Sequence, residues 1–151
     1  MSTPEAEKLN LTLTKLEVAV LQLDAALRLF MDGDYLSSLT LAGASEEILG
    51  KLCERAGKPI AVETIIAFHW GDTDPALTDK ERRDILLGVL NRARNAAKHA
   101  NDPNETQFFV EQVFPLQMIM RAMPMAKSLG LPPAGEAKMV AWIRAHPEAS
   151  R

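Results

Sequence analysis

The sequence has very little cysteine and lacks the common short catalytic motifs. Cys53 is the only cysteine among 151 residues, so an internal disulfide is impossible and zinc sites built on several cysteines of one chain are excluded. We expect the Cys53 thiol to pack as a small buried apolar group. Gly-rich phosphate loops, nucleophile-elbow motifs and the Glu-x-x-His pairs of di-metal bundles are absent. We therefore expect neither a metal nor a cofactor.

Aromatic residues, excess positive charge and long apolar runs are also scarce. Aromatics make up only 5% of the chain, which disfavours an RNA-binding sheet built on stacked rings. The net charge of −3 and the pI near 5.6 disfavour a surface that coats nucleic acid, although they permit a local basic patch. No apolar run approaches the roughly 20 residues that span a bilayer, and residues 1–7 lack the basic start and apolar core of a signal peptide. We expect a cytoplasmic protein without membrane association.

The length and the apolar pattern predict one helical domain. A chain of 151 residues corresponds to one domain at roughly 100–200 residues per domain. Strand patterns are nearly absent. Apolar residues instead recur at alternating steps of four and three, which is typical of a long helix packed in a bundle: Leu9, Leu13, Leu16, Val20, Leu23, Leu27 and Phe30. We expect a single domain over residues 1–151, with its core over about 10–129 and a short terminal helix over about 134–145.

Helix start and stop residues divide the first half of the chain. Gly33 ends the first helix, because glycine is favoured just after a helix C-terminus. Asp34 is expected to cap a second helix that runs to about Ala56. A short third helix is predicted over residues 61–68.

The second half is expected to hold two long helices. Thr78 and Glu81 fit a capping box, which predicts a helix over residues 79–100. Asn104 resembles another capped start, for a helix that continues to Leu129. Two prolines are expected to kink or interrupt that helix, Pro115 and Pro124. Together the predicted elements form an all-α, four-to-five-helix up-and-down bundle.

The most informative segment, residues 91–101, carries a basic and amide-rich face. On a helical wheel, the apolar residues of this region form one arc that is expected to face the core: Ile85, Val89, Leu90, Ala93, Ala96 and Ala97. The opposite arc is a polar strip, which consists of Asn91, Arg92, Arg94, Asn95, Lys98 and His99. From Lys80 to His99 there are six Lys or Arg and only two acidic residues.

This polar strip has two interpretations. Arginine grips phosphate oxygens bidentately, and histidine titrates near neutrality and can move a proton, so the strip suits a phosphate ligand. The alternative is a solvated basic face that complements the dipole at a helix C-terminus.

The run Arg94-Asn95-Ala96-Ala97-Lys98-His99 resembles the motif of the HEPN superfamily, in which an arginine and a polar residue precede a histidine near a helix end. The segment Leu39–Leu49 has small residues followed by the acidic pair Glu46 and Glu47, and it is similar to the second helix of that superfamily. The order of elements is similar as well, over roughly residues 10–125. The chain thus resembles a small stand-alone bacterial-type member.

The resemblance implies a HEPN-like bundle that forms a homodimer through its motif helices, with a composite cleft between the copies. Many such proteins are metal-independent endoribonucleases. It implies that Arg94 and Asn95 orient and neutralise the scissile phosphate, and that His99 is a general acid or base for attack by the 2′-hydroxyl. Further candidate substrate-binding residues are Asn91, Arg92, Lys98 and Glu46.

Several alternatives stay open. Glu46 either pairs with Arg94, positions His99, or is an ordinary residue at the boundary of the core. Some HEPN proteins do not cleave RNA and instead bind a nucleotide, RNA or a protein partner, as in toxin–antitoxin pairs. One subgroup carries a modified tyrosine two residues after the histidine, and this chain has Asn101 there. The third possibility is a structural helical protein with a solvated strip.

The remaining candidates are interpreted as packing. His69 and Trp70 are expected to end a helix that packs on the bundle, and His146 to lie in an inert tail. Four methionines around Pro124 are expected to fill the core or a dimer interface: Met118, Met120, Met123 and Met125.

Overall fold

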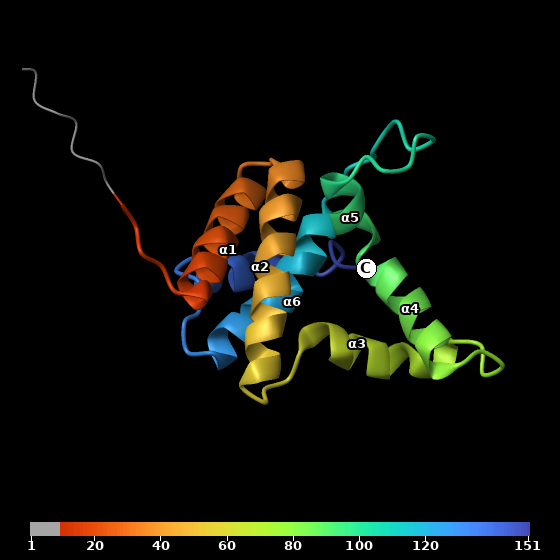
Figure 1. The fold of residues 1–151 in the computed structure, drawn as a ribbon. Coiled ribbons are helices and arrows are strands. Elements are labelled where there is room, and N and C mark those ends of the chain that lie inside the picture. Colours follow the sequence, from red (N-terminus) through yellow and green to blue (C-terminus); the bar gives the residue numbers. More distant parts are fainter. Residues whose placement is uncertain (1–9) are drawn as a thin grey trace, which may run out of the picture.

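The computed structural model describes residues 10–151, and these residues form an all-helical protein (Figure 1). Residues 1–7 and Leu9, which entered the sequence analysis, lie outside the described part. No strand occurs among residues 10–151, so the all-α class is confirmed. The elements are α1 (Lys15–Met31), α2 (Tyr35–Arg55), α3 (Ala61–His69), the 3-10 helix η1 (Trp70–Asp72), α4 (Asp79–Leu90), α5 (Arg92–Lys98), α6 (Val113–Ser128) and α7 (Glu136–Ala145).

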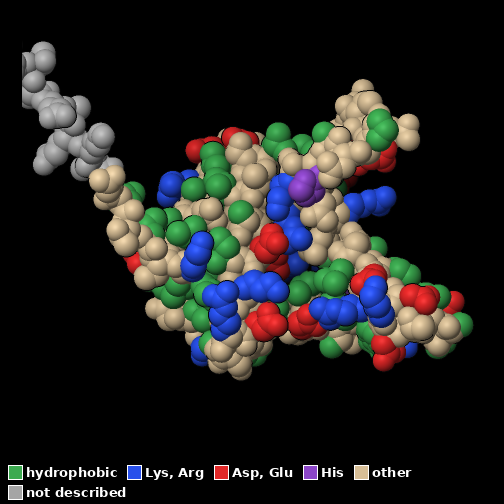
Figure 2. All heavy atoms as spheres, in the orientation of Figure 1, with side chains coloured by type: hydrophobic (Ala, Val, Ile, Leu, Met, Phe, Trp, Pro, Cys, Tyr) green, Lys and Arg blue, Asp and Glu red, His purple; other side chains and the backbone are tan. Residues whose placement is uncertain are grey.

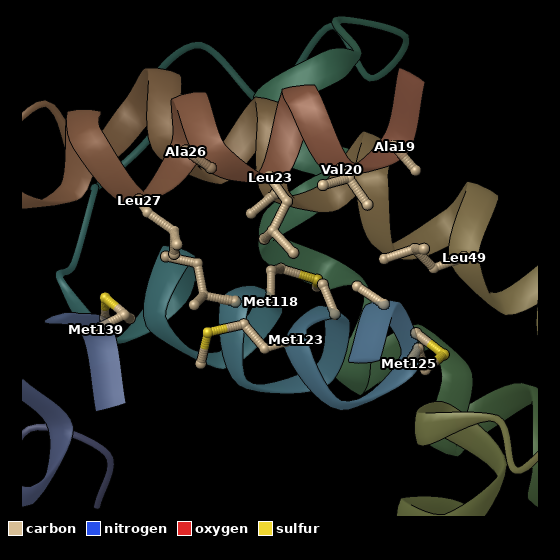
Figure 3. Packing of buried hydrophobic residues seen from close by; sticks show 14 of the residues in the cluster. Ala19, Val20, Leu23, Ala26, Leu27, Leu49, Met118, Met123, Met125 and Met139 are labelled. Carbon is tan, nitrogen blue, oxygen red and sulfur yellow. The ribbon is translucent and has the colours of Figure 1, made fainter. Parts of the chain in front are cut away.

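Helices α1, α2 and α6 pack against one another and carry the core (Figure 1). The predicted seven-residue repeat supplies the α1 side of it, since Val20, Leu23 and Leu27 are buried there. These side chains point toward Met118 and Met123 of α6 (Figure 3). Cys53 of α2 is fully buried in the same cluster, which confirms its expected packing role.

Two helices begin at the capping residues that the sequence predicted. Asp34 caps α2 through its Oδ1, which accepts a hydrogen bond from the Ser37 amide at 3.1 Å. Thr78 caps α4 in the same way through the Glu81 amide at 3.2 Å. The full capping box occurs instead at the start of α1, between Thr14 and its third following residue. The first helix therefore begins at residue 15, later than the apolar repeat suggests.

Small residues on α2 let α1 approach closely. The Ser45 hydroxyl donates to the Ala19 carbonyl at 2.7 Å, and the Ser38 hydroxyl donates to the Ala26 carbonyl at 2.8 Å. Both serines are fully buried, and a buried hydroxyl is tolerated because it is hydrogen-bonded. The small residues of the Leu39–Leu49 segment thus serve helix packing on one side of α2.

Helices α3 and α4 extend away from the three-helix core as an arm (Figure 1). The Arg83 guanidinium of α4 binds the Glu63 carboxylate of α3, with Nη1 2.6 Å from Oε2, and this contact lowers the pKa of Glu63 below its usual value. The Arg82 guanidinium lies 4.4 Å from the centre of the Trp70 ring, which is a cation–π contact. Polar and aromatic contacts therefore hold the arm together.

The expected core stripe is wrong for α4. No α4 residue is buried, and the side chains of Ile85 and Val89 are 52% and 69% exposed. Only the α5 part of the stripe packs on the core, through Ala93 and Ala97.

The predicted helix over residues 79–100 is also wrong, because the chain breaks at Asn91 into α4 and α5. Arg121 of α6 stabilises the break. Its Nη1 donates to the Leu90 carbonyl at 3.1 Å and its Nη2 to the Asn91 side-chain oxygen at 3.0 Å. A guanidinium thus satisfies a carbonyl at the end of α4, in the manner in which cations complement helix C-termini.

The predicted helix start at Asn104 is wrong as well. Residues 99–112 are irregular, and α6 begins at Val113. Pro115 suits this start, because proline lacks an amide hydrogen and is best accommodated in the first turn of a helix. Helix α6 then continues through Pro124. Three of its methionines are buried and Met120 is 39% exposed.

Candidate functional site

Arg94 of the motif joins a buried ionic centre between α5, α2 and α6. Its Nη1 lies 3.2 Å from Glu46 Oε2, and Arg121 Nη2 lies 2.8 Å from Glu46 Oε1. The three side chains, which we call the Glu46 centre, are only 12% exposed for Arg94, 6% for Arg121 and 5% for Glu46. Figure 2 shows acidic and basic side chains lying together over the seam between α2 and the α4–α5 segment.

The Glu46 centre holds two guanidinium groups and one carboxylate, so it carries an excess of one positive charge. The Nε atoms of Arg94 and Arg121 are buried and have no hydrogen-bond partner among the described residues. Leaving a buried charge incompletely paired is costly. The excess charge belongs to these three side chains, because the adjoining cavity is also lined by Glu47, Glu54 and Glu63.

Gly43 of α2 makes room for Arg94. A Cβ atom at residue 43 would lie 2.6 Å from Arg94 Cγ and 2.8 Å from Arg94 Cδ, which is closer than carbon atoms pack. The Arg94 side chain therefore crosses the surface of α2 at a position that only glycine allows. The Gly43 and Glu46 positions, one helical turn apart, together form the seat of Arg94.

The expected position of Arg94 on an exposed polar face is wrong. Its side chain faces α2. The chain changes direction at Asn91, so a helical wheel drawn through α4 does not predict which side of α5 faces the core. Of the three alternatives left open for Glu46, the structure shows the contact with Arg94. Glu47, next to it, is exposed and lies 3.6 Å from the Lys98 ammonium.

His99 follows the last residue of α5. Its backbone is extended (φ −127°, ψ 147°), and its amide donates to the Asn95 carbonyl at 3.0 Å. The side chain is exposed and lines a groove of about 840 Å³ together with Arg92 and Asn95. Among the described residues, no side chain or carbonyl forms a hydrogen bond with the His99 ring, so the imidazole is accessible to a ligand.

Arg94 and His99 line different cavities of the single chain. Arg94 borders a smaller cavity of about 320 Å³ between α2 and the α3–α4 arm, which Asn91 and Arg121 also line. His99 borders only the groove described above. The predicted site residues thus fall into two groups. The smaller cavity is lined by Arg94, Asn91 and Glu46, and the groove is lined by His99, Asn95 and Arg92. The Lys98 ammonium lies near the Glu47 carboxylate instead.

Sequence reasoning missed Arg121, which completes the Glu46 centre. The available signal is a single charged residue within the buried stripe of α6, among methionine, alanine and isoleucine. A cation at such a position needs a buried partner, and Glu46 is that partner.

The other histidines make local contacts away from this region. His69 ends α3 and its Nδ1 lies 3.0 Å from Asp72 Oδ2. His146 Nδ1 is 2.8 Å from the Trp142 carbonyl oxygen, and its ring stacks on that of Trp142. His69 lies at a helix end as expected, whereas His146, expected in an inert tail, packs on Trp142.

Residues 10–151 contain no group of three or more His, Cys, Asp and Glu side chains placed to bind a metal ion. Within the same range, every helix is too short or too polar to span a bilayer. No protein-family model matches the chain, and comparison with the curated proteins and with the solved structures found no match.

Proposed function

We propose that the chain is a HEPN-like, metal-independent endoribonuclease that acts as a homodimer, with Arg94 and His99 as its catalytic residues. The observation that carries the proposal is the seat of Arg94, where Glu46 binds the guanidinium and Gly43 leaves space for the aliphatic part. The motif arginine is thus held in one orientation. Such preorganisation is what a phosphate clamp requires, because a donor fixed before the reaction pays no reorganisation cost.

The chemistry follows from the two side chains. His99 takes the proton from a 2′-hydroxyl, and the 2′-oxygen attacks the neighbouring phosphorus atom. The bond from phosphorus to the 5′-oxygen of the next nucleotide breaks, and that oxygen receives a proton from a protonated imidazole, supplied by His99 of the second copy. The products are a 2′,3′-cyclic phosphate and a 5′-hydroxyl. One positioned histidine contributes about 10²–10⁴-fold in rate.

Arg94 stabilises the charge that develops on the phosphate. Its Nη1 is engaged by Glu46, whereas no described residue accepts a hydrogen bond from its Nη2. The excess positive charge of the Glu46 centre acts in the same direction. Arg92, Asn95 and Lys98 are exposed and are proposed to contact the RNA backbone, while Asn91 supports Arg121.

A homodimer is part of the proposal because each chain alone separates Arg94 from His99. The exposed apolar side chains of α4, Ile85 and Val89, lie next to the polar strip and provide a surface for a second copy. Exposed apolar patches of this kind are typical of protein interfaces. Two copies related by a two-fold axis at α4 and α5 would bring both polar strips to one cleft.

The second candidate function is a non-catalytic HEPN-like module that binds a nucleotide, RNA or an antitoxin-type protein partner. The separation of Arg94 and His99 into two cavities favours it. Under this alternative, Arg94 serves the fold through Glu46, and His99 contributes only to ligand binding.

Replacement of Arg94 by lysine tests the clamp. Lysine keeps the charge but loses the planar fork that holds Glu46 and a phosphate oxygen together. We expect cleavage to fall roughly 10²-fold and RNA affinity to change far less, with rate and affinity measured side by side and folding checked by circular dichroism. Arg144→Lys, on the exposed side of α7, is the matched control. Equal rates for wild type and Arg94→Lys would contradict the clamp, and RNA binding without cleavage by either would favour the binding module.

A further inference from the structure

The groove beside His99 has a lining that the proposed reaction does not explain. Three aromatic rings of the irregular segment and the start of α6 border it, those of Phe108, Phe109 and Phe114. Four amide side chains border it as well, those of Asn95, Asn101, Asn104 and Gln117. A chain with only 5% aromatic residues therefore places three of its five phenylalanines at one groove.

Phe109 presents its ring to the open groove. Its side chain is 78% exposed. The rings of Phe108 and Phe114, whose centres are 6.2 Å apart and whose planes differ by 26°, pack against the core. The exposed Phe109 ring offers a flat π surface at the groove. Stacking on such a ring is how proteins hold unpaired nucleobases.

The amide side chains supply hydrogen bonds at the edge of that surface. Within the described residues, the amides of Asn95 and Gln117 have no protein partner, although each can donate and accept. Both lie on helices, α5 and α6, which fix their positions. Asparagine and glutamine amides pair with the N6 and N7 atoms of adenine, which present one donor and one acceptor.

The charges of the groove favour a base over a phosphate or a protein partner. Arg92 and His99 border the groove, and so do the carboxylates of Asp102 and Glu105, so the groove has no strong net charge. Its amide-rich edge would leave many polar groups unpaired against an apolar helix of a second copy. A nucleobase suits both the weak net charge and the amide-rich edge of the groove, since it is flat, uncharged and polar at its rim.

We propose that this groove binds an unpaired adenine of single-stranded RNA, stacked on Phe109 and read by Gln117 and Asn95. The ligand class rests on the proposed function, because His99 lines the same groove and a base seated there places its own 2′-hydroxyl and phosphate next to the imidazole. Phe109 and Gln117 then determine specificity for the proposed reaction.

The test measures fluorescence anisotropy of short labelled 2′-O-methyl oligoadenylate and oligouridylate, which lack the nucleophilic hydroxyl and cannot be cleaved by the proposed route. We expect Phe109→Ala to weaken oligoadenylate binding about tenfold. Phe68→Ala is the matched control, since Phe68 is similarly exposed at 83% but lies on α3 outside the groove, and it should bind as wild type does. Equal affinities for wild type and Phe109→Ala would overturn the proposal, as would wild-type preference for oligouridylate.

A second pair of variants tests the reading of the base. Gln117→Ala should reduce the preference for adenine over uracil to about equal affinity, whereas Gln107→Ala, an exposed glutamine outside the groove, should retain it. Sedimentation of Phe109→Ala identifies the competing occupant, because dissociation of a dimer by this change would mean that a second copy covers Phe109 and would overturn the base site. Binding to uncleavable oligonucleotides is independent of catalysis. A wild type that binds them as expected but leaves natural RNA intact would refute the nuclease and preserve the adenine site.

Discussion

At the scale of single residues, Glu46 has the largest structural role in the candidate site. It is the only carboxylate that contacts Arg94 and Arg121 in the described part of the chain, and it is 96% buried by surface area. Removal of one partner from a buried ionic group leaves the others uncompensated, which is more costly than the net stabilisation that the intact group provides. The position of Arg94 thus depends directly on the charge of Glu46.

Glu46→Gln should therefore destabilise the fold by about 3 kcal/mol, because two buried guanidinium groups lose their counter-charge. The free energy of unfolding from urea titration measures this loss. Glu47→Gln is the matched control, since Glu47 is 56% exposed and only 3.6 Å from Lys98, and it should change stability by less than about 0.5 kcal/mol. Similar losses for the two variants would show that the centre contributes no special stability.

At the scale of helices, the close approach of α5 to α2 depends on Gly43. Arg94 is fixed at its tip by Glu46 and at its base by α5, so its middle carbon atoms have little freedom to move away from an added methyl group. Crowding of this kind typically costs 1–3 kcal/mol. It exceeds the benefit of about 1 kcal/mol that alanine brings over glycine inside a helix.

Gly43→Ala should thus lower the free energy of unfolding by about 1 kcal/mol and reduce any cleavage activity, because Arg94 must shift. Gly50→Ala, in the same helix, has only Ile60 nearby at an ordinary 3.7 Å and should be neutral or stabilising. Urea titration of both variants with a cleavage assay distinguishes the two positions. A Gly43→Ala protein as stable and active as Gly50→Ala would contradict the seat described for Arg94.

The helix ends that were predicted correctly are those marked by nearby residues that end or cap a helix. Gly33 and Asp34 separate α1 from α2 by chemistry that acts within a few residues, and α2 ends within one residue of the expected position. The break at Asn91 was not predictable in this way. Arg121, which satisfies the polar groups at the break, lies 30 residues further along the chain, and a hydrogen bond of that range leaves no local pattern.

In the candidate site, too, some features follow from nearby residues and others depend on the three-dimensional fold. The Arg94 to His99 segment was singled out from residue identity and resemblance, and a contact between Glu46 and Arg94 was one of the alternatives that the sequence left open. The burial of Arg94 and the exposure of Ile85 and Val89 depend on the orientation of α4 and α5 on either side of the break at Asn91. Phe108 and Phe109 were overlooked, and they lie in the stretch from Asn104 that was expected to be helical.

At the scale of the whole molecule, the exposed apolar side of α4 predicts association of two copies. Ile85→Glu combined with Val89→Glu should convert a dimer into a monomer, since a buried unpaired carboxylate at an interface is strongly unfavourable. The fold should be preserved, because both side chains are more than half exposed in the single chain. Sedimentation at micromolar concentration with circular dichroism measures both properties. A wild-type protein that sediments as a monomer would contradict the homodimer, as would a double variant that remains dimeric.

The central claim is that His99 transfers a proton in RNA cleavage without a metal. The most direct measurement is the rate of cleavage of single-stranded RNA in excess chelator, with the product ends identified by mass spectrometry. We predict 2′,3′-cyclic phosphate ends for wild type, a loss of at least about 10²-fold for His99→Ala, and no loss for the control His69→Ala, whose side chain is 45% exposed at the end of α3. His99→Ala should remain within about 0.5 kcal/mol of wild-type stability, because the side chain is exposed. Full activity of His99→Ala, or no cleavage by wild type under these conditions, would contradict the account.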